Sequence, residues 1–128
     1  IEVVEQLHQM TIPMGVVTSN TTANATAFLE KYAVLDCFEF VKGSKRTKKK
    51  HKKLRKVLRN YPDIPTEHIL YIGDEVRDIA ACRKVNIQCG AVTWGQASRQ
   101  LLEQHTPDVF FDAPAQILDF VQQVNRQS

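Results

Sequence analysis

Short apolar stretches alternate with amphipathic helical stretches along this chain, and the alternation limits the possible folds more than any other feature. Apolar stretches that suit strands lie at 14–18, 38–41, 69–72, 88–93 and 108–111. Helical spacing is found over 3–10, 22–32, 48–60, from Val76 onward, at 98–104 and over 114–124. Strands that alternate with helices form a parallel sheet with both faces covered. The sequence therefore predicts an α/β fold, a doubly wound parallel sheet with helices on both faces, in one domain over residues 1–128.

The turns after two of these strands carry polar residues. Right-handed crossovers place the carboxyl ends of parallel strands along one edge of the sheet. Thr18, Ser19 and Asn20 close the strand at 14–18, and Asp74 follows the strand that ends at Gly73. We therefore expect both groups to lie on that edge.

The stretch 69–78 brings two carboxylates to the start of a helix. Gly73 allows a sharp turn where a side chain would crowd. Asp74 then lies at or just before the helix start, and Asp78 lies about one turn further, so their carboxylates can converge. Oxygen ligands of this kind suit Mg²⁺. The alternative is a structural role, with Asp74 as the N-cap and Asp78 as a solvated acid of the first turn.

The chain contains one strongly basic segment. Eleven of the 17 basic residues lie between Lys42 and Arg59, where no acidic residue occurs. A basic helix can bind nucleic acid, but no aromatic residue interrupts the run to stack on bases. A solvated helix face is the commoner explanation, so nucleic acid is the weaker prediction.

Periodicity separates Lys50 from the other lysines. The apolar stripe of its helix consists of Leu54, Val57, Leu58 and Tyr61. At 100° per residue, Lys50 falls within about 30° of the centre of the stripe. Three other lysines fall about 90° or more away, namely Lys49, Lys52 and Lys53. We expect Lys50 to point inward, where an ammonium group needs an anion or water.

The composition sets the class of protein. A chain of 128 residues with 43% hydrophobic and 24% charged residues has the balance of a globular domain. No apolar run approaches the roughly 20 residues of a membrane span, and no leader resembles a signal peptide. These features predict a cytoplasmic protein that has no membrane partner. Three cysteines without CxxC spacing predict reduced, mostly buried thiols.

Three groups on one edge would make a site for phosphoryl chemistry. The hydroxyls and amides of 18–20 open a helix and can cradle a phosphoryl group, although such residues alone are more often a helix cap. Lys50 and the acidic turn at Asp74 would add a cation and a Mg²⁺ site. Phosphoryl transfer needs such groups, because donors and cations must hold the charge on the phosphoryl oxygens.

The order of these motifs resembles the haloacid dehalogenase-like superfamily, and within it the phosphoglycolate phosphatase-like hydrolases. The resemblance covers nearly the whole chain and is carried by VVTSN at 16–20, KH at 50–51, YIGDEVRD at 71–78 and AVTWG at 91–95. It implies a Mg²⁺-dependent phosphatase of small phosphorylated metabolites that works through an aspartyl-phosphate.

The resemblance also implies a role for each residue of these motifs. Thr18 would be the hydroxyl that binds phosphate, with Ser19 and Asn20 beside it. Lys50 would bind phosphate as well and balance the charge on the nucleophile.

Three acids would form the metal site by the same resemblance. Asp74 would be the Mg²⁺ ligand and Asp78 the second acid, with Glu75 assisting through a water. Lys50 and Asp78 are the two catalytic candidates.

One motif of that superfamily does not occur in these 128 residues. The superfamily's first motif, DxDGT/V, supplies the nucleophilic aspartate and the general acid/base, and it has no counterpart here. By the family's layout it would lie upstream of Ile1, together with any cap domain. We therefore expect this chain to be the C-terminal part of a larger hydrolase and to have no significant turnover alone.

A missing central strand would leave strand edges without partners. It would lie between the strands that end at Thr18 and Gly73, whose facing edges would carry unpaired amides and carbonyls. We expect the isolated chain to pair these strands directly, to associate with another copy through them, or to stay partly molten.

Two functions of another class stay open. One is a binding or regulatory module that holds phosphate or a partner without turnover, which the absent nucleophile favours. The other is a nucleic-acid-binding domain that uses the basic helix.

Overall fold

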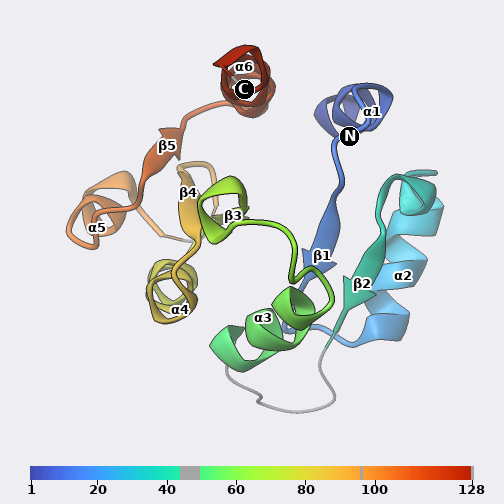
Figure 1. The fold of residues 1–128 in the computed structure, drawn as a ribbon, viewed down its shortest axis with the longest axis horizontal. Coiled ribbons are helices and arrows are strands. Elements are labelled where there is room, and N and C mark those ends of the chain that lie inside the picture. Colours follow the sequence, from blue (N-terminus) through green and yellow to red (C-terminus); the bar gives the residue numbers. More distant parts are fainter. Residues whose placement is uncertain (44–49, 96, 128) are drawn as a thin grey trace. The chain divides into compact units, whose positions relative to one another are not determined.

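The structure is a computed structural model that describes residues 1–43, 50–95 and 97–127, without the side chains of 125–127. It divides into two compact units, Ile1–Lys49 with Leu118–Ser128, and Lys50–Ile117. Helices and parallel strands alternate along the chain (Figure 1), which confirms the predicted α/β class. The prediction of one domain over 1–128 stays a prediction. No helix in the described ranges is long and apolar enough to cross a membrane.

The first unit is built around two parallel strands. Its elements are α1 (Glu2–Gln9), β1 (Gly15–Val17), α2 (Thr22–Lys31), the 3₁₀ helix η1 (Leu35–Cys37) and β2 (Phe40–Lys42). β1 pairs with β2, with Val16 opposite Val41. The β2 strand begins two residues later than predicted, because η1 closes through a bond from the Phe38 N–H to the Leu35 carbonyl.

The second unit contains a three-stranded parallel sheet. Its elements are α3 (Lys50–Arg59), η2 (Thr66–His68), β3 (Leu70–Gly73), α4 (Val76–Val85), β4 (Gln88–Val92), α5 (Arg99–Glu103), β5 (Val109–Phe111) and the start of α6 (Pro114–Gln127). The strand order is β3-β4-β5, with Gly73 opposite Ala91 and Val92 opposite Phe111. The carboxyl ends of β3, β4 and β5 therefore lie along one edge. The predicted start of the helix at Lys48 and the loop at Ser44 lie outside the described residues.

Most of the buried core belongs to the second unit. Four of the five residues of the central strand β4 are buried, because β4 has a partner on each side. The largest fully buried side chains are Phe111, Ile79, Leu102, Cys82 and Cys89. All three cysteines are free thiols, and two of them are fully buried, as the sequence predicts.

The described strands pair within each of the two units. Among the described residues β1 pairs only with β2, and β3 pairs at one edge only, with β4. Direct pairing of β1 with β3 stays a prediction. Periodicity predicts that a segment is a strand, but pairing depends on neighbours far away in the sequence.

The α5 helix offers a matched test of the second unit's core. Leu102 is fully buried and Leu101, its neighbour, is 43% exposed. We expect Leu102→Ala to lower the free energy of unfolding by about 3–5 kcal/mol, and Leu101→Ala to lower it by less than about 1 kcal/mol. Urea unfolding of both variants measures this difference. Equal losses would contradict the packing of α5.

Candidate active site

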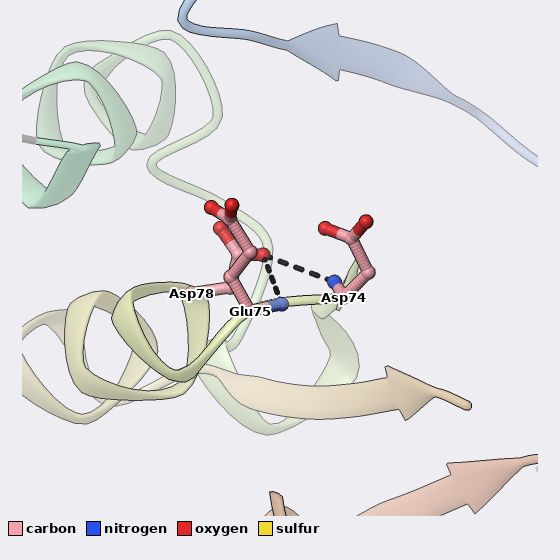
Figure 2. A group of neighbouring side chains, drawn as sticks. All are labelled: Asp74, Glu75 and Asp78. Atoms are coloured by element: carbon pink, nitrogen blue, oxygen red, sulfur yellow. Dashed lines mark hydrogen bonds between the residues drawn. The ribbon is translucent and has the colours of Figure 1, made fainter. Parts of the chain in front are cut away.

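The turn between β3 and α4 gathers three carboxylates. Asp74 follows the last residue of β3, Glu75 is the N-cap of α4, and Asp78 lies in the first turn of that helix. Each offers an oxygen within 4.8 Å of the others, and their side chains lie close together in Figure 2. The predicted convergence of Asp74 and Asp78 is thus found, and Asp74 lies just before the N-cap.

Asp78 closes the turn with one of its carboxylate oxygens. Asp78 Oδ2 accepts the backbone N–H groups of Asp74 at 3.0 Å and of Glu75 at 3.1 Å (Figure 2). The Glu75 side chain in turn accepts the Asp78 N–H, which completes a capping box. The side chain of Asp78 is 3% exposed, so the alternative of a solvated first-turn acid is wrong.

Gly73 makes room for this carboxylate. A Cβ atom at Gly73 would lie 2.4 Å from Asp78 Oδ2 and 2.6 Å from Asp78 Cβ. The φ angle of Gly73 is not in the left-handed region. Glycine is therefore needed here for space, as the sequence predicts.

Lys50 reaches the second oxygen of Asp78. Its Nζ lies 2.6 Å from Asp78 Oδ1, and the lysine side chain is only 14% exposed. The same ammonium group lies 5.4 Å from the centre of the Tyr71 ring. Lys50 therefore points inward at the first residue of α3, as its place on the helix predicts, and its partner is an acid of the predicted site.

Burial and charge shift the pKa values of two of these groups. Burial alone would lower the pKa of Lys50, but its hydrogen bonds with Asp78 and Tyr71 outweigh burial and raise it. Burial raises the pKa of Tyr71, and the nearby Lys50 only partly opposes this. Lys50 is therefore charged and the Tyr71 phenol protonated at neutral pH.

The buried surface of α3 extends further round the helix than its apolar stripe. Lys53 lies about 90° from the stripe's centre, on the face predicted to be solvated, yet it is 3% exposed. Along the helix it neighbours Lys50 at three residues and Val57 at four. α3 packs against α4, and the angular position of Lys53 on the helix did not predict its burial.

Thr18, Ser19 and Asn20 form a turn in the first unit. Thr18 Oγ1 accepts the Asn20 N–H at 3.1 Å, and Asn20 Oδ1 accepts the Thr21 N–H at 2.8 Å. The cap of α2 is Thr21, whose Oγ1 accepts the Asn24 N–H. The predicted residues therefore precede the cap and do not form it.

The structure brings together four of the seven predicted site residues. They are Lys50, Asp74, Glu75 and Asp78, all in the second unit. The other three, Thr18, Ser19 and Asn20, belong to the first unit. One shared site for both groups stays a prediction.

The donor set of the acidic cluster fits a hard divalent cation. All the candidate ligand atoms are carboxylate oxygens, which suit Mg²⁺. Asp78 already binds Lys50 and two amides, and Glu75 pairs with Arg77. Glu75 and Asp78 therefore have fewer lone pairs left to contribute, and all three acids stay candidate ligands.

Comparisons with known proteins agree with this fold. The model of the haloacid dehalogenase-like hydrolase family matches residues 1–92. The phosphoglycolate phosphatase of Synechococcus elongatus is 31% identical over 126 residues, 98% of this chain and 59% of that protein. That of Pectobacterium atrosepticum is 27% identical over 122 residues, 94% of this chain and 52% of that protein.

A solved structure shows the same fold. A haloacid dehalogenase-like family hydrolase from Streptococcus pneumoniae matches with a TM-score of 0.84 at 23% identity, over 94% of this chain and 57% of that one. This chain thus spans between half and three fifths of the length of the relatives it matches.

The buried ion pair can be tested by a double-mutant cycle. Lys50→Met and Asp78→Ala each leave a largely buried group without its partner, so each should cost about 3–5 kcal/mol of unfolding free energy. The double variant should cost about 1–3 kcal/mol less than the two single costs together. Glu103→Ala, which removes an exposed ion pair, should have a far smaller effect. Additive costs in urea unfolding would contradict the pair.

The stability of the protein at alkaline pH depends on Lys50 and Tyr71. Lys50 and Tyr71 have pKa values raised above their ordinary 10.5 and 10.0. Their contribution to stability is fully present below pH 10.0 and is lost as the pH rises through the folded-state values. We expect the unfolding free energy of the wild type to fall more steeply above that pH than in a Lys50→Met, Tyr71→Phe variant. The same pH dependence of the unfolding free energy in both proteins would contradict this. Lys52→Met, which changes an exposed neighbour, is the control.

Proposed function

Because the chain belongs to the haloacid dehalogenase-like hydrolase family, we propose that the whole protein is a Mg²⁺-dependent phosphatase of small phosphate esters. The observation that carries the proposal is the buried Lys50–Asp78 pair at the turn that bears Asp74. Two relatives at 31% and 27% identity are phosphoglycolate phosphatases, which supports a phosphoglycolate-like substrate. The predicted cytoplasmic location stays a prediction.

Lys50 would supply a fixed positive charge for the phosphoryl group. Its raised pKa keeps it protonated at neutral pH, and the 2.6 Å contact with Asp78 fixes the position of its Nζ. A cation held in place before the reaction stabilises developing charge without reorganising in the transition state. Asp78 would orient Lys50 and the turn that bears Asp74.

Asp74 would hold Mg²⁺, with Glu75 and Asp78 contributing directly or through waters. When bound, the cation would neutralise charge on the phosphoryl oxygens. Few oxygens of this chain are available to it, so the chain alone should bind Mg²⁺ weakly.

The phosphate would also need donors from the first unit. Thr18 Oγ1 accepts the Asn20 N–H, and we propose that the same hydroxyl binds a phosphate oxygen. Ser19 is exposed and can add a second hydroxyl. Their approach to Lys50 is part of the proposal.

The nucleophile is proposed to lie outside these 128 residues. Asp78 is engaged with Lys50 and two amides, and Asp74 is the proposed metal ligand. Neither suits the attack on phosphorus that forms an aspartyl-phosphate and expels the alcohol. We therefore propose that this chain alone has no significant turnover.

A binding or regulatory module is the second candidate. Such a module would hold phosphate or a partner without turnover. Nucleic-acid binding is further weakened, because Lys50 and Lys53 of the basic helix are largely buried and not available to a phosphate backbone.

Hydrolysis assays distinguish these functions. The whole protein should hydrolyse phosphoglycolate and para-nitrophenyl phosphate with Mg²⁺, and Asp74→Asn should lower the rate by about 100-fold or more. Asp63→Asn, an exposed acid in the turn after α3, is the matched control and should leave the rate unchanged. The 128-residue chain should be inactive.

Two outcomes would contradict the proposal. Activity of the bare chain that disappears with Asp74→Asn would place the nucleophile among the residues described above. A whole protein that binds inorganic phosphate but hydrolyses neither ester would favour the regulatory module.

A further inference from the structure

The turn between β4 and α5 lies against Asp74. Its described residues are Thr93, Trp94, Gly95, Ala97 and Ser98, and we name them the β4–α5 turn. β3 and β4 are parallel neighbours, with Gly73 opposite Ala91. The chain therefore leaves both strands at the same edge of the sheet, which brings this turn beside the acidic cluster.

Gly95 allows the close approach to Asp74. A Cβ atom at Gly95 would lie 2.2 Å from Asp74 Cβ and 2.5 Å from Asp74 Oδ2. The φ angle of Gly95 is outside the left-handed region, so this glycine too is needed for space. Rotation of the Asp74 side chain leaves its Cβ in place, so a side chain at Gly95 would force the backbone to move.

Ala97 holds the same aspartate through its main chain. The Ala97 N–H donates to the Asp74 carbonyl at 3.1 Å. Asp74 is thus contacted on its side chain by Gly95 and on its backbone by Ala97. These two contacts limit the positions that the Asp74 carboxylate can take.

Asp112 binds the first residue of the β4–α5 turn and the first residue of α5. Its Oδ1 accepts Thr93 Oγ1 at 2.9 Å and Arg99 Nη1 at 2.7 Å. The Arg99 guanidinium also lies 4.5 Å from the centre of the Phe110 ring. The Thr93 hydroxyl and Arg99 lower the pKa of Asp112, so the anchor is ionised at neutral pH.

We infer that the β4–α5 turn is a positioning element for Asp74, acting through Gly95 and Ala97 and held by Asp112. The inference rests on the proposed function for the cation, and it adds residues that determine how tightly the cation binds. A carboxylate already held in place binds a cation more tightly, because binding does not have to order it. Gly95 and Asp112 act through Asp74 and are positioning residues.

The test is Mg²⁺ binding to the full-length protein, measured by calorimetry. Gly95→Ala should weaken Mg²⁺ binding by about 10- to 100-fold. Asp112→Ala, at an exposed anchor, should weaken it by roughly threefold. Both variants should also speed hydrogen exchange of the Ala97 amide in metal-free protein, a readout that requires no activity.

The matched control is Glu103→Ala. It removes the 3.0 Å ion pair of Arg99 with Glu103 and leaves the bond to Asp112 in place. We expect its Mg²⁺ affinity and Ala97 exchange to match the wild type. The unfolding temperature of every variant is recorded, and Asp112→Ala decides alone if Gly95→Ala does not fold.

Each contrary outcome has a distinct meaning. Wild-type Mg²⁺ affinity in Gly95→Ala and Asp112→Ala, with loss in Asp74→Asn, would overturn the inference and leave the proposed function standing. Mg²⁺ binding that is absent from the wild type, or unaffected by Asp74→Asn, would overturn both. An equal loss in Glu103→Ala would assign the effect to general destabilisation and also overturn the inference.

Discussion

The carboxylate of Asp78 holds the second unit's site together. One oxygen binds the Lys50 ammonium at the start of α3, and the other accepts two amides of the turn between β3 and α4. A nearly buried carboxylate is stable only when its charge and lone pairs are satisfied. Here the Lys50 ammonium and two backbone N–H groups meet that need. The Asp78 carboxylate therefore joins the start of α3 to the turn that bears Asp74.

Two glycines make the site compact. Gly73 gives space to Asp78, and Gly95 gives space to Asp74, with both glycines outside the left-handed region of φ. In each case a missing Cβ lets a carboxylate approach backbone from a neighbouring segment. One carboxylate oxygen of each of the three acids can therefore lie within 4.8 Å of the others. The requirement is steric, so alanine is as unsuitable as a larger residue.

The two units differ in how well their strands are covered. Among the described residues β4 pairs with β3 and β5 and has four buried residues, whereas β1 pairs with β2 and has none that is buried. In the first unit the buried apolar side chains are few, and Phe28 of α2 is exposed. Pairing at both edges satisfies the amides and carbonyls of a strand, and elements packed on its faces bury its side chains. The acidic site is accordingly found on the better-packed sheet.

Local sequence determined the type and order of the elements, because helical and strand periodicity depend on residues a few positions apart. The same local geometry correctly placed Asp74 and Asp78 one turn apart and Lys50 inward. Only the tertiary structure decided that Lys53 is buried and that Gly95 packs on Asp74. These features join segments distant in the chain, and no local period encodes which segments will meet.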